Sequence, residues 1–342
     1  MSWLGRLPQR GRLVFVAVAL VVAFGSATAL GYGPLASHDY RGAPGGAVTI
    51  QVKPGDSLAA IARTLEGAKV VKSASYFVKR NLASPRATKV QPGYYAMFEH
   101  MPSTNAFNRL FDPAARVRTR VLVPDGARAS RIYERLSDRT GIPIDDFRAA
   151  ARQVRLPGYA QGDIEGMLWP ATYSFDPDAT ARGIIEELVS TAEREHRRLG
   201  VTAGARGLTA RQLLTVASII QVESYAPDYT KVSRVVFNRL ERGMRLQMDS
   251  TLNYALGTAK WTFTSTERRN PSRYNTFMHD GLPIGPIGNP GAGAIRAAMS
   301  PAAGDWVYFV TTDPDKGTTE FASTYAQFEV LRRKFQQWLA AQ

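Results

Sequence analysis

The stretch from Thr209 to Glu223 constrains the fold more than any other part of the sequence, because it specifies a whole helix. Thr209 and Gln212 have the spacing of a capping box, so a helix should begin at this point. Glu223 continues the apolar face of this helix in its last turn. That face has side chains spaced as i, i+3, i+4 and i+7, namely Leu213, Val216, Ala217 and Ile220.

The position of Glu223 predicts an unusual carboxyl group. A carboxylate there would lose hydration and would meet the negative end of the helix dipole, and both effects favour the protonated form. A carboxylic acid that keeps its proton near neutral pH can act as a general acid. The alternative is a glutamate at a frayed helix end that reaches into water, because Glu is rarely buried. The pattern alone leaves both interpretations open.

The composition limits the possible kinds of active site. The chain has 342 residues and 44% hydrophobic content, enough for two or three domains with their own cores. It contains no cysteine, which excludes disulfides, thiol nucleophiles and cysteine-bound zinc. The 4 histidines lack metal-ligand spacing, and no phosphate-binding loop, dinucleotide-binding glycine motif or Gly-x-Ser-x-Gly elbow is present. A Ser-His-Asp site could still assemble through space, but we predict neither a metal nor a cofactor.

The formal net charge of +14 predicts attraction to anionic partners, such as nucleic acid, acidic lipid head groups or an acidic polymer. An equally weighted alternative is a background of scattered arginines. These arginines form no single run with interleaved aromatic residues, so the pattern of a nucleic-acid-binding surface is weak.

An uncharged apolar run covers residues 13–30. As a helix it would extend roughly 27 Å, which is just enough to cross the hydrocarbon core of a membrane. Arginines precede the run, so residues 1–12 are predicted to stay in the cytoplasm. A signal peptide cleaved near Ala27-Thr28-Ala29 is the rival interpretation, and the length of the run favours a retained anchor. Either way, residues after about 31 are expected to lie outside the cytoplasm, which disfavours a genomic nucleic-acid partner.

The remaining chain predicts an α+β fold in two domains after a linker. Residues 31–47 are rich in Gly, Ala and Pro and are predicted to be the linker. Residues 48–115 form a small α+β domain, whose strand-Pro-Gly-helix opening from Val52 to Ala62 resembles a LysM-like glycan-binding module. Residues 116–342 form a larger mixed α/β domain.

Two loops in the larger domain have distinctive compositions. The stretch 163–175 combines a proline with aromatic side chains, which suit either stacking on a sugar or capping a core. The Gly/Pro-rich stretch 281–291 is long for a loop without elements of its own, which is typical of functional or disordered segments. Its prolines and apolar residues favour an ordered wall.

Five separated strings in the larger domain have specific sequences. They are Asp163-Ile164-Glu165-Gly166-Met167-Leu168-Trp169-Pro170-Ala171-Thr172-Tyr173, Ala217 to Glu223, Val236 to Leu240, Met244 to Thr251, and Tyr274-Asn275-Thr276 with the 281–290 loop. Together they resemble those of the endolytic murein lytic transglycosylases of the MltG, or YceG-like, family. The resemblance extends from about residue 48 to about residue 335. The chain departs from the family pattern at Gln221, where a second acid is common, at Ala171, where Asp is frequent, and at Ile284, where a second Pro is usual.

The resemblance implies a membrane-anchored endolytic enzyme that cleaves MurNAc–GlcNAc bonds in nascent peptidoglycan strands, forms 1,6-anhydroMurNAc and ends strand elongation. The C6 hydroxyl of the sugar is the nucleophile, so one acid/base is enough, and Glu223 is assigned that role. A structural role for Arg239 has equal weight with sugar binding. The residues assigned to substrate binding are Asn238, Arg239, Gln247, Asp249, Tyr274 and Asn275.

The alternative function is a non-catalytic peptidoglycan-binding or scaffolding membrane protein that uses the LysM-like domain. In both cases the predicted partners are peptidoglycan glycan strands and the membrane, and association with peptidoglycan synthases is left open. No nucleic-acid partner is predicted.

Overall fold

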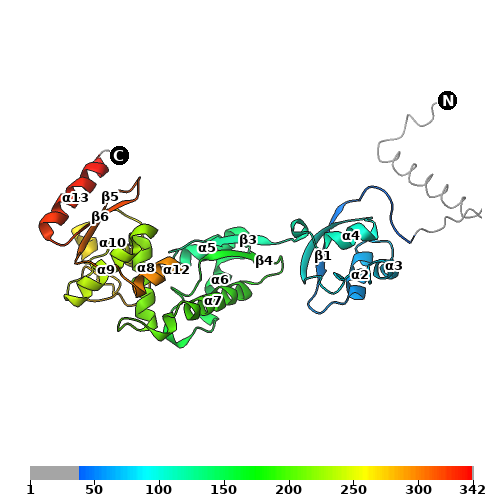
Figure 1. The fold of residues 1–342 in the computed structure, drawn as a ribbon, viewed down its shortest axis with the longest axis horizontal. Coiled ribbons are helices and arrows are strands. Elements are labelled where there is room, and N and C mark those ends of the chain that lie inside the picture. The colour runs from blue at the N-terminus through cyan, green and yellow to red at the C-terminus, as the bar shows by residue number, and fades with distance from the viewer. Residues whose placement is uncertain (1–37, 341–342) are drawn as a thin grey trace, which may run out of the picture. The chain divides into compact units, whose positions relative to one another are not determined.

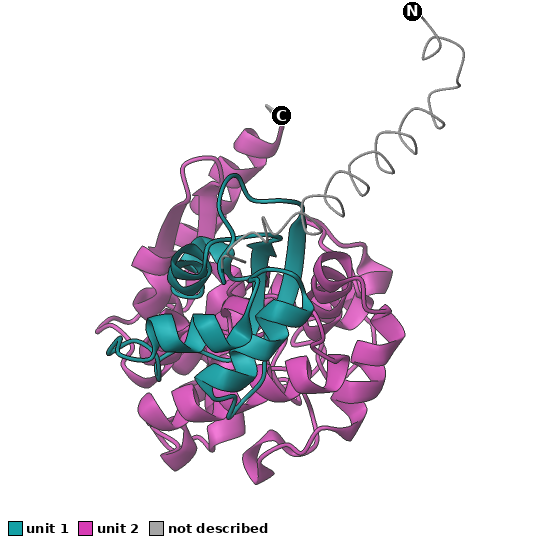
Figure 2. Cartoon of the chain, turned by 90° about the vertical axis from the view of Figure 1, so that its right-hand side faces the viewer, with its two compact units in different colours: residues 1–117 teal, residues 118–342 magenta. Residues whose placement is uncertain are grey.

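The computed structural model describes residues 38–340, and the chain divides into two compact units, residues 1–117 and 118–342 (Figure 2). The predicted cytoplasmic segment 1–12, the predicted transmembrane run 13–30 and the start of the predicted linker lie outside the described residues. Within the described part of the chain, no helix is both long and apolar enough to span a membrane. Helices combine with small two-stranded sheets, which confirms the predicted α+β class.

The first unit packs helices against a two-stranded antiparallel sheet, in which Val52 pairs with Gly93. Ser57 and Ser73 begin its first two helices, because each hydroxyl oxygen accepts a hydrogen bond from a backbone N–H three residues later. The elements in chain order are β1 (Ala47–Val52), α2 (Leu58–Gly67), α3 (Ala74–Asn81), β2 (Gly93–Phe98), α4 (Ser103–Arg109) and the 3-10 turn η2 (Pro113–Ala115) (Figure 1).

The second unit contains two hydrophobic cores, and the first of them forms around an antiparallel strand pair. Val121 and Tyr173 lie opposite each other on the two strands and are both buried in this core. Three helices supply most of the remaining buried side chains. The elements are β3 (Thr119–Val123), α5 (Ala129–Thr140), α6 (Ile144–Gln153), the turn η3 (Gly158–Ala160), β4 (Ala171–Phe175) and α7 (Ala181–Arg198).

The helix α8 (Ala210–Glu223) is the centre of the second core. Its predicted capping box is confirmed, since Thr209 N–H donates to Gln212 Oε1 at 2.9 Å and Gln212 N–H donates to Thr209 Oγ1 at 3.3 Å. The sequence predicted one apolar face, but every residue from Leu213 to Ile220 is buried. The two hydroxyl groups in this stretch donate to carbonyls of the same helix, which allows burial without unpaired polar groups.

Helices α9, α10 and α12 pack around α8, and a C-terminal hairpin with its own helix completes the unit. The elements are η4 (Val201–Ala203), η5 (Ala226–Asp228), α9 (Tyr229–Glu241), α10 (Asp249–Leu256), α11 (Ser265–Arg268), α12 (Ala292–Met299), β5 (Tyr308–Asp313), β6 (Thr318–Ala322) and α13 (Tyr325–Ala340).

His196 on α7 is fully buried near the boundary between the two cores. Its Nδ1 lies 3.1 Å from the Tyr159 hydroxyl, and the Trp169 ring meets it edge-on at 5.8 Å between centroids. Trp169 packs against side chains of both cores, which supports the core-capping interpretation of the 163–175 loop. Burial lowers the pKa of His196 to about 4, because the cationic imidazolium would be poorly solvated.

Replacing His196 with Phe should remove an acid-sensitive contribution to stability. The fold favours the neutral imidazole, so the unfolded state binds the proton first as the pH falls from about 6.5 to about 4. The wild type should lose roughly 3 kcal/mol of unfolding free energy over that range through this group. Urea unfolding of both proteins at several pH values measures the difference. An identical pH dependence in the two proteins would contradict this expectation.

Candidate active site

Glu223 is the last residue of α8 and is half-buried. Its Oε1 accepts a hydrogen bond of 2.9 Å from the backbone N–H of Ser250, in the first turn of α10. Burial raises the pKa of Glu223, as the sequence predicted; the hydrogen bond from Ser250 opposes this shift, the neighbouring charge of Asp249 adds to it, and that of Arg239 opposes it. The carboxyl group therefore combines raised proton affinity with a fixed position.

Asp249 and Gln247 come from the segment that leads into α10. Burial raises the pKa of Asp249, and the charge of Arg268 lowers it. Gln247 is exposed and has a left-handed backbone with φ of 49°, which is uncommon for a residue other than glycine. The backbone around it is held at Thr276, whose carbonyl accepts from Gln247 N–H at 3.2 Å. Neither Asp249 nor Gln247 has a side-chain hydrogen bond or ion pair within residues 38–340.

Asn238 and Arg239 on α9 are buried, and their donors reach backbone carbonyls. Asn238 Nδ2 donates to Trp306 O at 2.8 Å and to Gly304 O at 3.2 Å. Arg239 donates to Val307 O through Nε and to Leu246 O through Nη1, each at 2.6 Å. These bonds support the structural alternative for Arg239, whose charge also lowers the pKa of Glu223. Sugar binding by these two residues stays a prediction.

Tyr274 and Asn275 differ in their burial and in the contacts of their side chains. Asn275 is fully buried, and its Nδ2 donates to Asn270 O at 2.7 Å and to Arg268 O at 3.0 Å, so its amide holds the turn together. Tyr274 is half-buried with its ring 4.6 Å from that of Tyr254. The structure thus brings Gln247, Asp249 and Glu223 into one region, and gives Asn275 internal partners.

Glu165 is a second buried carboxyl group, which the sequence analysis did not assign to the site. It is 5% exposed and accepts from Ala129 N–H at 3.0 Å, Asn289 Nδ2 at 2.8 Å and the Tyr254 hydroxyl at 3.0 Å. Burial is the main cause that raises the pKa of Glu165 to about 7. In the sequence, the indication was an acidic residue among the apolar residues that follow Asp163, because a buried acid needs hydrogen-bond partners.

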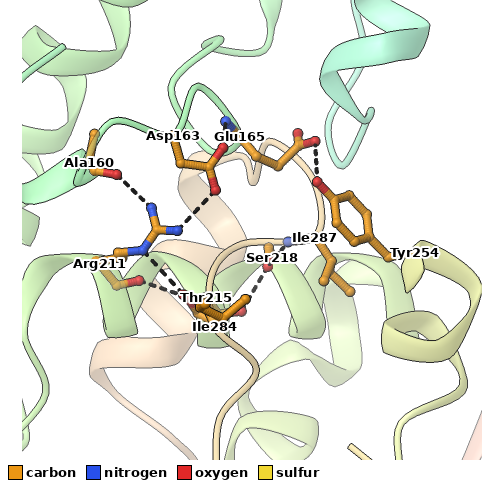
Figure 3. A network of polar contacts seen from close by, with 9 residues as sticks. All are labelled: Ala160, Asp163, Glu165, Arg211, Thr215, Ser218, Tyr254, Ile284 and Ile287. Atoms are coloured by element: carbon orange, nitrogen blue, oxygen red, sulfur yellow. Dashed lines mark hydrogen bonds and ion pairs between the residues drawn. The ribbon is translucent and has the colours of Figure 1, made fainter. Parts of the chain in front are cut away.

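The Gly/Pro-rich loop is fixed by hydrogen bonds, as expected for the ordered segment that the sequence predicted; its role as a wall of the groove stays a prediction. Arg211 on α8 donates to Asp163 Oδ2 at 2.9 Å, to Ala160 O at 2.6 Å and to Ile284 O in this loop at 3.3 Å (Figure 3). Ser218 Oγ accepts from Ile287 N–H at 3.0 Å. The loop is therefore fastened along α8, the helix that carries Glu223.

Gln221 occupies the position where the sequence departs from the family pattern. Its Nε2 donates to the hydroxyl of Tyr229, and its Oε1 accepts from Gly291 N–H at 3.0 Å. A neutral amide thus anchors the end of the loop without adding a second charge two residues from Glu223. Within residues 38–340, no group of three or more Asp, Glu and His side chains is placed to hold a metal.

Comparison with known proteins identifies the family. The model of the YceG-like family matches residues 50–334. The chain belongs to the YceG-like family. Among solved structures, this YceG-like chain is similar to a YceG-like protein from Listeria monocytogenes, with 26% sequence identity and a TM-score of 0.56. The match covers 83% of this chain and 99% of that one.

Two curated relatives of this YceG-like chain are called endolytic murein transglycosylase. The Bacillus subtilis (strain 168) protein is 29% identical over 310 residues, which is 84% of each chain. The protein of Streptococcus pneumoniae serotype 2 (strain D39 / NCTC 7466) is 25% identical over 313 residues, which is 81% of this chain and 56% of the relative. The match therefore spans little more than half of the pneumococcal protein.

Replacing Gly288 with Ala should destabilise the second unit by on the order of 2 kcal/mol. Gly288 is buried, and an added Cβ would overlap the carbonyl oxygen of Gly126. Gly293 in α12 is the matched control, since an added Cβ there meets only Tyr229 at 3.5 Å. Gly293→Ala should stabilise by up to about 1 kcal/mol through helix propensity. Thermal unfolding of both variants measures the contrast, and equal melting temperatures would refute it.

Proposed function

We propose that this chain is a membrane-anchored endolytic peptidoglycan transglycosylase, in which Glu223 is the acid/base. The proposal is supported by family membership and by the shared designation of the two curated relatives. The observation that carries it is the placement of Glu223: a half-buried carboxyl group with a raised pKa at the end of a fully packed helix, hydrogen-bonded to the start of another helix.

The reaction needs one proton shuttle and no water. Protonated Glu223 gives its proton to the glycosidic oxygen between MurNAc and GlcNAc, and the bond from that oxygen to the anomeric carbon breaks. The resulting carboxylate then accepts the proton of the MurNAc C6 hydroxyl, whose oxygen attacks the anomeric carbon. The products are a 1,6-anhydroMurNAc end and a free GlcNAc end, and Glu223 is protonated again. Because the nucleophile is tethered, a second carboxylate is unnecessary.

The environment of Glu223 favours the first step. Burial and the charge of Asp249 both raise its pKa, which keeps the proton available for donation. In this proposal Gln247, Asp249 and Tyr274 contact the sugars, because their side chains are only partly buried or exposed. Asn238, Arg239 and Asn275 hold the surrounding backbone through the bonds described above.

The placement of the enzyme follows from the N-terminal sequence. Residues 13–30 would be a retained anchor in the bacterial inner membrane, with the bulk of the chain outside the cytoplasm. Residues 48–115 would be a LysM-like glycan-binding domain, and residues 116–342 the catalytic domain. An anchored active site meets newly made strands beside the membrane, which would limit strand length and suit association with synthases.

Replacing Glu223 with Gln should lower the rate of anhydro-end formation by about 10³-fold, because the amide cannot give or take the proton. The assay incubates purified protein with uncrosslinked glycan and detects 1,6-anhydroMurNAc ends by mass spectrometry.

For the wild type, activity should fall as the pH rises through the raised pKa of Glu223, since only the protonated form donates. The same assay at several pH values measures this decrease.

The matched control is Glu241→Gln, an exposed glutamate near the end of α9 that should keep full activity. Retained anhydro-end formation in folded Glu223→Gln would overturn the catalytic assignment. Binding of glycan by the wild type without any cleavage would instead favour the non-catalytic alternative.

Removing residues 1–37 should release the protein from the membrane. The full chain should float with lipid vesicles in a density gradient, whereas a protein that begins at residue 38 should stay at the bottom, because the apolar run has been lost. Mass determination of the mature protein from membranes checks the retained anchor. A mature N-terminus near residue 30 would show a cleaved signal peptide instead.

A further inference from the structure

Helix α10 connects two carboxyl groups, those of half-buried Glu223 and buried Glu165. Ser250 and Tyr254 are four residues apart, so they lie one above the other, about 6 Å apart along the helix axis. Ser250 N–H donates to Glu223 at 2.9 Å, and the Tyr254 hydroxyl donates to Glu165 at 3.0 Å. A single turn of α10 thus joins the candidate acid to a second carboxyl group outside the assigned site.

Glu165 cannot move with α10, because other elements hold it. Its Oε1 accepts from Ala129 N–H at the start of α5 and from Asn289 Nδ2. Asn289 is fixed in turn, since its Nδ2 also donates to Ala127 O at 2.9 Å and its Oδ1 accepts from Leu168 N–H at 2.7 Å. The carboxyl group of Glu165 is therefore a fixed reference point between the first core and α10 (Figure 3).

Helix α8 is also held in position relative to Glu165, through hydrogen bonds from the Gly/Pro-rich loop. Asn289 lies in the Gly/Pro-rich loop, and two backbone N–H groups of that loop donate to α8: Ile287 to Ser218 Oγ and Gly291 to Gln221 Oε1, each at 3.0 Å. Glu223 ends this helix, two residues after Gln221 and five residues after Ser218. Both partners of the Glu223–Ser250 hydrogen bond are thus positioned relative to Glu165.

We infer that Glu165 is a positioning residue, which acts through Tyr254 to hold the start of α10 against Glu223 and so sets how tightly Glu223 keeps its proton. The catalytic part of this inference rests on the proposed function. Glu165 does not itself reach the substrate in this scheme, because its side chain is enclosed by the three donors that surround it.

The charges near each carboxyl group agree with this arrangement. Glu165 has the carboxylate of Asp163 and the guanidinium of Arg128 as charged neighbours, and Arg128 also lies over the Tyr254 ring at 5.3 Å from its centroid. Around Glu223, the charged neighbours are Asp249 on α10 and Arg239 on α9. The ionised form of Glu165 is the better acceptor for the Tyr254 hydroxyl, so its titration is linked to the position of α10.

Tyr254→Phe tests the inference by removing one hydroxyl group with little change in volume. The Ser250 hydrogen bond favours ionised Glu223, so a loosened α10 raises the pKa of Glu223. We expect kcat to fall about 10-fold while KM changes less than about 2-fold, and the basic limb of the pH profile to move upward by about half a pH unit. Glu165→Gln should produce changes in the same direction.

Tyr159→Phe is the matched control, because it also removes one tyrosine hydroxyl contact to a titratable side chain, at His196 near the boundary between the two cores. It should leave kcat and the basic limb of the pH profile unchanged. A role of Tyr254 in stability alone would lower its melting temperature without moving either quantity in the folded fraction.

A second readout needs no activity. Titration of the wild type, followed by carbon-13 resonances of the glutamate side chains and by the Ser250 amide resonance, should show that the Ser250 amide follows the ionisation of both Glu223 and Glu165. Tyr254→Phe should move the Glu223 titration to higher pH.

An unchanged Glu223 titration and an unchanged pH profile in folded Tyr254→Phe would overturn the inference, as would a Ser250 amide that follows Glu223 alone. Absence of anhydro ends from the wild type would instead refute the proposed function and leave the titration result to decide this inference.

Discussion

Two carboxyl groups, buried Glu165 and half-buried Glu223, each accept a hydrogen bond from the first turn of a helix. Glu165 accepts from Ala129 N–H at the start of α5, and Glu223 accepts from Ser250 N–H at the start of α10. Helix starts present unpaired N–H groups and a positive partial charge, so they can stabilise a carboxyl group that has lost its water. The two hydrophobic cores are joined through Glu165, because its carboxyl group accepts from Ala129 N–H in the first core and from the hydroxyl of Tyr254, which packs against the second. These partners offset the cost of burying the carboxyl group.

The sequence predicted the local features of the site well, because local spacing determines them. The capping box at Thr209, the helix that follows it and the direction of the pKa shift of Glu223 all depend on residues within a few turns of each other. The enclosure of α8 on all sides was not predicted, since the apolar spacing marks only one face and Thr215 and Ser218 lie outside it. Their hydroxyls donate to carbonyls within the helix, which a sequence pattern does not reveal.

The role of Glu165 could not be found from spacing. Its three donors lie 36, 89 and 124 residues away along the chain, so only the folded structure brings them together. The same limit applies to Asn238 and Asn275, whose amides were predicted to face sugars. Their carbonyl partners either lie far along the chain or depend on the exact path of a turn. Residue type alone does not distinguish an amide that holds a loop from one that holds a ligand.

Two buried groups change the stability of the fold in opposite directions over nearly the same pH range. His196, with a pKa lowered to about 4, reduces the stability of the fold as the pH falls. Glu165, with a pKa raised to about 7, increases it over the same fall, because the folded state holds its proton more tightly. Their contributions largely cancel between about pH 4.5 and 6.5. Moderate acidification therefore changes the protonation of both groups with little net effect of this pair on the stability of the fold.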